Sequence, residues 1–146
     1  MADTRSPEVR RRIMQAVRTR DTGPEMIVRR LLHFLGFRYR LHRKSLPGSP
    51  DIVFPSRKRI VLVHGCYWHG HGCPKGRLPK SRLDYWRAKI ESNRRRDRRN
   101  IRSLRRLGWA VLVVWQCETH DARLLQRRLL RFLGESQQNR STRRTA

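Results

Sequence analysis

The chain has 146 residues, of which 37% are hydrophobic, so it is long enough for one domain with an ordinary core. It contains 36 Lys and Arg against 11 Asp and Glu, for a net charge of +25, and 31 of the basic residues are Arg. This balance favours a nucleic-acid partner, because the guanidinium fork binds phosphates and base edges, although charge alone leaves a ribosome-like packing protein open. We expect no membrane segment, since no apolar run approaches the roughly 20 residues of a spanning helix. We also expect no secretory signal and, with an odd three cysteines, no disulfide framework.

Two helices are predicted at the N-terminal end. Residues 6–20 begin with a Ser-Pro pair suited to a helix start, and a row of arginines makes this helix a candidate DNA-contacting arm. A second helix follows Thr22, where Thr22 and Glu25 fit a capping box and Gly36 fits the stop. Its predicted buried stripe comprises Ile27, Val28, Leu31, Leu32 and Leu35.

Three strands are predicted next. Residues 37–41 alternate like a half-buried strand, and residues 51–54 and 59–63 read as two strands joined by a turn at 55–58. We expect the latter two to form a hairpin. The segment CYWHGHGC then follows as a loop with two internal glycines.

A long helix is predicted over residues 81–107, and its expected inner face consists of Leu83, Trp86, Ile90, Ile101, Leu104 and Leu107. The apolar run at 109–115 predicts a strand buried on both faces. A final helix is expected at about 121–133.

The predicted order is α-α-β-β-β-α-β-α, which indicates a single α/β domain with a mixed central β-sheet flanked by helices on both faces. The strand ending at Val63, the long helix and the strand at 109–115 form a β-α-β unit, so these two strands should be parallel. We expect the domain to cover residues 1–134. Residues 135–146 are polar and Arg-rich, and we expect a disordered basic tail.

Cysteines and a histidine with metal-ligand spacing occur in the loop after the second hairpin strand. Cys66, His71 and Cys73 have the spacing C-x4-H-x-C, and Cys117 follows the strand at 109–115. Parallel strands of a β-α-β unit end at the same edge of a sheet, so Cys117 should lie near the loop. A Cys3His set predicts a structural zinc site, because zinc takes tetrahedral thiolate and imidazole ligands. In the alternative, Cys117 is only a small buried hydrophobe.

The zinc site leaves Tyr67, Trp68, His64 and His69 without a role. The aromatic pair could belong to the core, or it could form a wedge that unstacks bases. A histidine at this position suits a general base near neutral pH.

Acidic residues are scarce in this chain, so their positions are informative. Asp51 precedes an apolar strand, where a carboxylate needs a partner or a metal ion. Together with His69 or His64 it meets the needs of phosphodiester hydrolysis, in which a carboxylate-held divalent ion polarises the phosphate. Alternatives remain: Asp51 as a turn residue, Glu25 as a capping residue, and Asp97 as an acid that offsets its arginine neighbours.

Five motifs, in this order, closely resemble the very-short-patch mismatch-repair endonucleases. They are RDT at 20–22, LPGSPDIV at 46–53, HGCYWHGHGC at 64–73, RRDRR around Asp97 and LGWAVLVVWQC at 107–117. The resemblance covers about residues 5–133. It implies a restriction-endonuclease-like fold and magnesium-dependent nicking of one DNA strand on the 5′ side of the T in a T:G mismatch, as left by deamination of 5-methylcytosine.

The resemblance also implies a role for each matching residue. Asp51 and the main-chain carbonyl of Val63 would bind magnesium, and His69 would be the general base. Glu25, His64 and Asp97 would hold metal-bound waters or the phosphate. The zinc ligands would be Cys66, His71, Cys73 and Cys117. Tyr67 and Trp68 would intercalate from the major groove and Met14 from the minor groove.

Further expectations concern the setting of the protein. The resemblance implies a functional link to a cytosine-5 DNA methyltransferase, with other mismatch-repair proteins as further candidate partners. We expect a monomer in the bacterial cytoplasm, associated with the nucleoid through DNA.

The sequence departs from the family pattern at three points. Tyr67 stands where Phe is expected, and Val63 stands where Thr is expected. The second hairpin strand lacks the acid and lysine of many restriction enzymes, so the base must be a histidine. Two other functions stay open: a nuclease of the same fold with a non-mismatch target, and a zinc-containing DNA-binding protein without catalysis.

Overall fold

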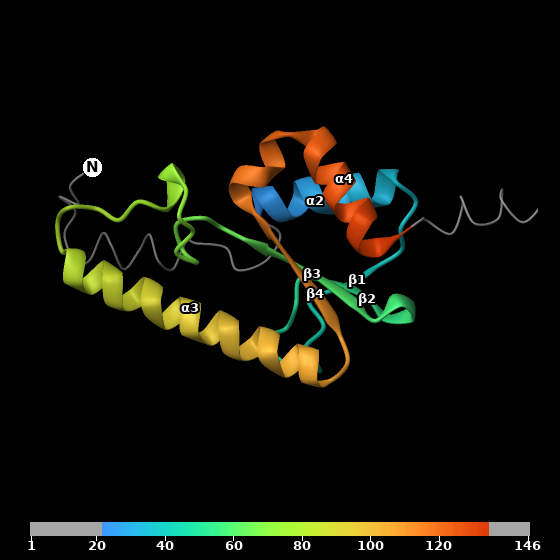
Figure 1. The fold of residues 1–146 in the computed structure, drawn as a ribbon, viewed down its shortest axis with the longest axis horizontal. Coiled ribbons are helices and arrows are strands. Elements are labelled where there is room, and N and C mark those ends of the chain that lie inside the picture. The colour runs from blue at the N-terminus through green and yellow to red at the C-terminus, as the bar shows by residue number, and fades with distance from the viewer. Residues whose placement is uncertain (1–21, 135–146) are drawn as a thin grey trace, which may run out of the picture.

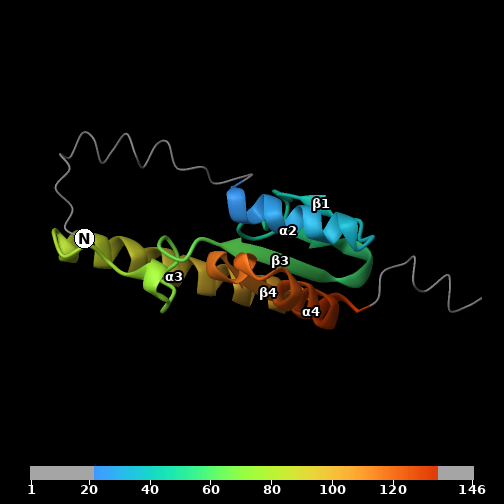
Figure 2. The same ribbon diagram turned by 90° about the horizontal axis from the view of Figure 1, so that it is seen from above.

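The computed structural model describes residues 22–134 (Figures 1 and 2). The predicted helix at 6–20, including Met14, and the predicted tail at 135–146 lie outside this range. The helices and strands, in chain order, are α2 (Gly23–Phe34), β1 (Arg40–Leu41), β2 (Ile52–Phe54), β3 (Arg59–His64), α3 (Leu83–Arg106), β4 (Ala110–Trp115) and α4 (Ala122–Leu133). Three short 3-10 turns accompany them: η1 (Pro55–Arg57), η2 (Pro74–Gly76) and η3 (Gln116–His120). The predicted order of elements from the second helix onward is confirmed.

The four strands form one mixed sheet in the order β1-β2-β3-β4. β2 and β3 pair antiparallel as the predicted hairpin, turning at η1 and at Lys58, which has a left-handed backbone. β3 and β4 pair parallel, with Val63 opposite Val114, as the β-α-β argument predicts. Their carboxyl ends therefore lie side by side at one edge of the sheet.

Helices cover both faces of the sheet. α2 and α4 lie together on one face and α3 lies on the other (Figures 1 and 2). The core under α2 and α4 includes Val28, Leu32, Phe54, Val61, Val114, Leu125, Leu129 and Leu133. The core under α3 includes Val53, Ile60, Leu104 and Trp109. Each fully buried aliphatic side chain contributes about 1.5–3 kcal/mol, so these two layers hold the strand ends in place.

β1 is shorter than predicted, because its partner β2 has only three residues and the ladder consists of two pairs. The alternation that predicted a longer strand still holds for the side chains. Phe37 is buried, Tyr39 is half-buried, and each ring meets Phe54 edge-on at 6.2 Å.

The prediction that the 109–115 strand is buried on both faces is wrong. Within β4 only Val114 is buried, because the strand lies at the edge of the sheet, where the flanking helices cover it incompletely. Two residues of the predicted helix stripes are also exposed: Ile27 at 42% and Leu107 at 55%. Leu107 lies in the C-terminal cap of α3, beyond its last packed turn.

α3 is a long basic helix. Its 24 residues correspond to about 36 Å at 1.5 Å per residue. Its exposed arginines are Arg87, Arg94, Arg95, Arg96, Arg98, Arg99, Arg102, Arg105 and Arg106. Among residues 22–134, no helix combines the length and the apolar character needed to cross a membrane.

Candidate active site and metal centre

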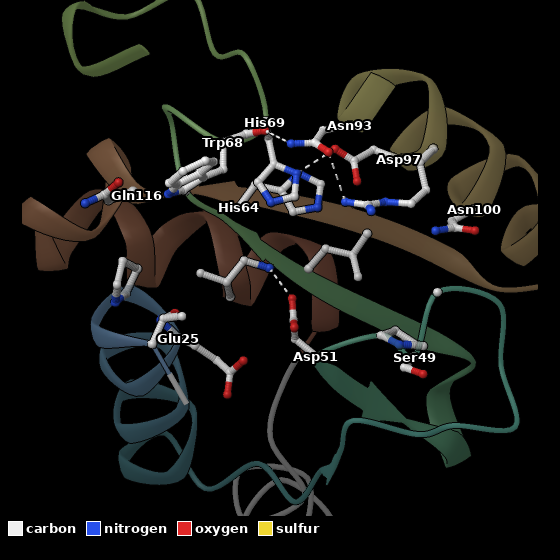
Figure 3. A pocket seen from close by; sticks show the side chains of 18 of the residues that line it. Glu25, Ser49, Asp51, His64, Trp68, His69, Asn93, Asp97, Asn100 and Gln116 are labelled. Atoms are coloured by element: carbon white, nitrogen blue, oxygen red, sulfur yellow. Dashed lines mark hydrogen bonds and ion pairs between the residues drawn. The ribbon is translucent and has the colours of Figure 1, made fainter. Parts of the chain in front are cut away.

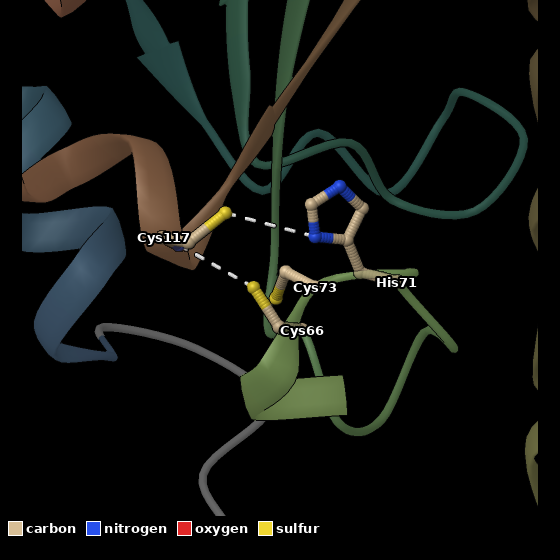
Figure 4. A group of neighbouring side chains, drawn as sticks. All are labelled: Cys66, His71, Cys73 and Cys117. Atoms are coloured by element: carbon tan, nitrogen blue, oxygen red, sulfur yellow. Dashed lines mark hydrogen bonds between the residues drawn. The ribbon is translucent and has the colours of Figure 1, made fainter. Parts of the chain in front are cut away.

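A cluster of three cysteines and one histidine lies at the edge where β3 and β4 end (Figure 4). Cys66 follows β3, Cys117 lies in η3 directly after β4, and His71 and Cys73 belong to the loop between β3 and α3. One ligand atom from each of the four lies within 4.8 Å of the others. Cys117 Sγ is 3.6 Å from His71 Nδ1, and the Cys117 N–H donates to Cys66 Sγ at 3.3 Å.

The donor set suits a tetrahedral metal ion. Bonds of about 2.0–2.3 Å to thiolate and imidazole place neighbouring ligand atoms about 3.5 Å apart, close to the distance between Cys117 and His71. All three cysteines are free rather than paired in a disulfide. The structure thus brings together the four residues that the sequence spacing and strand topology predicted.

The backbone of the loop is fitted closely around this cluster. The His71 N–H donates to the Cys66 carbonyl at 2.9 Å, and the His71 ring stacks on Trp115 with centroids 4.2 Å apart. A side chain at Gly76 would place its Cβ 1.9 Å from the His71 carbonyl oxygen. Only glycine can therefore occupy position 76 without moving the loop.

A cleft of about 810 Å³ lies among α2, the loop before β2, the end of β3 and α3 (Figure 3). Its lining includes every residue predicted for catalysis or magnesium binding: Glu25, Asp51, Val63, His64, His69 and Asp97. These residues come from four separate parts of the chain, and the fold brings them to one cavity.

Asp51 lies directly before β2, and its side chain faces β3. Its Oδ2 accepts a hydrogen bond from the Val63 N–H at 2.8 Å. Burial raises the pKa of Asp51 to about 6 from its ordinary value of 3.8; the Val63 N–H opposes this rise and the nearby Glu25 carboxylate adds to it. Glu25 and His42 supply ligand atoms within 4.8 Å of the Asp51 carboxylate. A divalent cation fits the two carboxylates of this group, because it would neutralise a carboxylate that burial alone makes costly to ionise.

A histidine–aspartate pair lies across the cleft from Asp51. His69 Nδ1 is 2.6 Å from Asp97 Oδ2, so Nε2 is the ring nitrogen that can accept a proton. The His69 ring stacks on His64 with centroids 3.9 Å apart. Burial, with a smaller contribution from His69, lowers the pKa of His64 to about 4, so His64 is uncharged at neutral pH.

The aromatic pair lies beside the cleft. Tyr67 and Trp68 are half-buried, meet edge-on at 5.0 Å, and each also contacts Trp86 of α3 edge-on. Trp68 lines the cleft, and its carbonyl accepts a hydrogen bond from the buried Asn93 at 2.9 Å. Tyr67 and Trp68 are therefore neither fully buried in the core nor fully exposed, and they pack against Trp86 of α3.

Glu25 is more than a helix cap. Its N–H donates to the Thr22 side chain at 3.4 Å, which confirms Thr22 as the cap of α2. The Glu25 carboxylate, however, is only 2% exposed and lies against His42, with Arg29 approaching one oxygen at 3.4 Å. Capping alone does not account for a buried carboxylate in the cleft.

Sequence reasoning missed three residues near the site. His42 contacts Glu25 and also donates its backbone N–H to the Asp51 carbonyl at 3.1 Å. Asn93 holds the Trp68 carbonyl, and Gln116 accepts a hydrogen bond from the Cys66 N–H at 3.4 Å. The helical spacing from Trp86 and Ile90 could have revealed Asn93 as inward-facing.

The chain is similar in sequence to several DNA endonucleases. The family model described as "DNA mismatch endonuclease Vsr" matches residues 2–75. The chain is 60% identical over 136 residues to the "Type II nicking enzyme V.XorIIP" of Xanthomonas oryzae pv. oryzae, covering 93% of this chain and 100% of that protein. It is 42% identical over 135 residues to the "Type II nicking enzyme V.NmeAIP" of Neisseria meningitidis, covering 92% and 96%. It is also 42% identical over 117 residues to the "DNA mismatch endonuclease Vsr" of Escherichia coli, covering 80% and 75%.

These matches define the class of the protein as a DNA endonuclease. Within that class, the chain belongs to the Vsr family of DNA mismatch endonucleases.

Proposed function

We propose that the protein nicks one strand of duplex DNA on the 5′ side of the T in a T:G mismatch, by magnesium-dependent phosphodiester hydrolysis. Family membership and the names of its relatives support strand nicking. The observation that carries the proposal is the placement of the His69–Asp97 pair and Asp51 in one cleft. With a DNA phosphate in this cleft, His69 would be the general base on one side and Asp51 the cation-binding carboxylate on the other.

His69 is the proposed base. Asp97 contacts Nδ1 at 2.6 Å, which fixes the ring orientation and leaves Nε2 to take a proton from the attacking water. The water oxygen then bonds to phosphorus as a backbone P–O bond breaks. His64, uncharged and stacked on His69, keeps the ring plane in place.

Asp51 is the proposed principal ligand of magnesium, together with the Val63 carbonyl. Magnesium, when bound there, would polarise the scissile phosphate and stabilise charge that develops on it. Asp51 itself is oriented by the Val63 N–H, and Glu25 lies close enough to position water or phosphate oxygens. The carboxylates of this cleft are hard to explain in a DNA-binding protein without catalysis, because they would repel phosphate.

Zinc is the proposed occupant of the Cys66, His71, Cys73 and Cys117 cluster. Four protein ligands close the coordination shell, as in structural rather than catalytic sites. A metal ion there would fix the loop that carries Tyr67, Trp68 and His69. The cluster would therefore act on catalysis through loop position, and not through contact with the phosphate.

Tyr67 and Trp68 are the proposed wedge at the mismatch, with Met14 as a third intercalating residue. Their partial exposure beside the cleft and the Asn93 hydrogen bond to Trp68 support a rigid wedge. Base–aromatic stacking contributes about 1–3 kcal/mol per base, and it offsets the opening of a base step. A mismatched step costs less to open, and this favours T:G over paired DNA.

The remaining parts of the proposal concern fold and setting. The mixed sheet with helices on both faces is consistent with a restriction-endonuclease-like fold. We propose a monomer that acts on DNA in the bacterial cytoplasm and is linked in function to a cytosine-5 methyltransferase and to other mismatch-repair proteins. The exposed arginines of α3 and the net charge of +25 supply the attraction to the phosphate backbone.

A nicking assay tests the function directly. The protein is incubated with Mg²⁺ and labelled duplexes that carry T:G, A:C or no mismatch. We expect nicking of the T strand of T:G alone. Equal cutting of all three duplexes would favour a nuclease with a non-mismatch target, and binding without cutting would favour a DNA-binding protein.

An active-site variant tests the mechanism. Asp51→Ala should abolish nicking and retain binding to the T:G duplex, because Asp51 holds the cation and not the bases. Nicking at the wild-type rate by this variant would contradict the assigned role of Asp51.

A further inference from the structure

His42 lies next to the cleft residues Glu25 and Asp51, at a position for which the sequence patterns predict no function. The pairing of Leu41 with Ile52 brings the next residues, His42 and Asp51, opposite each other, and the His42 N–H donates to the Asp51 carbonyl. His42 Nε2 is 3.1 Å from each of the two Glu25 carboxylate oxygens. One residue thus contacts both acidic residues on this side of the cleft.

The backbone at His42 is in an unusual conformation. Its φ is +45°, in the left-handed region that a residue with a side chain rarely adopts. Such a backbone is strained and persists where surrounding contacts hold it, often at functional sites. The side chain is only 13% exposed, so this conformation directs the imidazole inward rather than into solvent.

Arg29 also contacts Glu25. Arg29 lies one helical turn along α2, and its Nη1 is 3.4 Å from Glu25 Oε2. His42 instead approaches from a different element and bridges both oxygens at a shorter distance. His42 therefore helps to hold the Glu25 carboxylate toward Asp51.

We propose that His42 is a positioning residue, which holds the Glu25 carboxylate toward Asp51 and thereby sets the affinity of this side of the cleft for a divalent cation. The inference rests on the proposed function for its catalytic consequence, but its effect on cation binding is independent of nicking. His42 does not line the cleft, so it acts through Glu25 and not on the substrate. Residues that orient metal ligands in this way typically change metal affinity or activity by about 10–100-fold when replaced.

Mn²⁺ binding to the full-length, zinc-containing protein tests the proposal, with free Mn²⁺ measured by electron paramagnetic resonance. The Mn²⁺ bound at the cleft is taken as the Mn²⁺ that the wild type binds and that the Asp51→Ala variant does not. His42→Gly should weaken this binding about tenfold or more. Because glycine accepts a positive φ freely, relief of backbone strain should offset part of the lost Glu25 contact, and the variant should still fold, as checked by its circular dichroism spectrum. His42→Gln retains an N–H donor and should stay within about threefold of the wild type.

A double-mutant cycle separates positioning from a structural role. In a Glu25→Gln background, His42→Gly should change Mn²⁺ affinity and nicking by less than about twofold, because the group through which it acts is altered. The inference would be overturned if His42→Gly bound Mn²⁺ with wild-type affinity, or if His42→Gly lowered Mn²⁺ affinity equally with Glu25 and with Gln at position 25. It would also be overturned if His42→Gln bound Mn²⁺ as weakly as His42→Gly. If the wild type fails to nick T:G duplexes, the proposed function fails, while the Mn²⁺ measurements still decide the role of His42.

Discussion

Replacing Asp51 by Asn should remove activity and yet make the magnesium-free protein more stable. Burial raises the pKa of Asp51 from 3.8 to about 6, so the fold favours the neutral acid over the carboxylate. Asparagine has nearly the same shape, is neutral, and can still accept the hydrogen bond from the Val63 N–H. The variant therefore retains the local geometry without the buried charge.

The size of this effect follows from the pKa. Each pKa unit corresponds to about 1.4 kcal/mol, so the rise from 3.8 to about 6 sets an upper limit of about 3 kcal/mol at pH 8. Attraction between the carboxylate and the nearby His42 and His69 is lost in the variant. That attraction is already included in the pKa, and we expect a gain of about 1–3 kcal/mol.

The gain should depend on pH in a defined direction. Between about pH 4 and pH 6 the folded protein binds a proton at Asp51 that the unfolded chain has released, so wild-type stability falls as pH rises through this interval. Asp51→Asn lacks this decline. The difference in the free energy of unfolding should be near zero at pH 4 and complete above about pH 7.

Urea unfolding at pH 5 and pH 8, in magnesium-free buffer without a chelator, measures the difference. Asp84→Asn is a matched control, because Asp84 is an exposed acid in the first turn of α3 and its replacement should change stability little. An Asp51→Asn protein that is less stable than the wild type at both pH values would refute the reasoning.

Three other changes have expected outcomes. Cys117→Ala should lose the one zinc ion expected per chain, along with solubility, measured by elemental analysis of the purified protein. Asp97→Asn should lower the single-turnover nicking rate by about 10²–10⁴-fold with T:G binding retained, because the carboxylate that orients His69 is gone; an unchanged rate would remove Asp97 from the mechanism. Gly76→Ala should destabilise the loop by about 3 kcal/mol or more, whereas Gly72→Ala, where an added Cβ meets nothing within 4 Å, should be within about 1 kcal/mol of the wild type in urea unfolding.

The metal cluster could be predicted from the sequence because it depends on topology rather than on side-chain detail. A β-α-β connection requires the ends of β3 and β4 to meet, and this places Cys117 beside Cys66. Periodicity likewise predicted the buried Leu32 and Leu104. These features follow from rules that hold whatever the neighbouring residues are.

Other features depend on details that periodicity does not contain. His42 reaches the site only through the register of a two-residue strand and a left-handed backbone. Glu25 has the spacing of a capping residue, and only the tertiary contact with His42 shows where its carboxylate lies. The incomplete burial of β4 depends on how far the helices extend over the edge of the sheet, which an apolar run cannot reveal.

The two strand-end cysteines also have a consequence for folding. Cys66 and Cys117 are 51 positions apart, and the whole of α3 lies between them. A metal ion bound by both cysteines would cross-link the two ends of this segment, much as a disulfide bond would. For a permanent cross-link of that length, the loss of chain entropy in the unfolded state corresponds to about 4 kcal/mol. If the metal ion stayed bound after unfolding, it would keep the ends of β3 and β4 close together in the unfolded chain. The two strands would then pair again with a smaller loss of chain entropy.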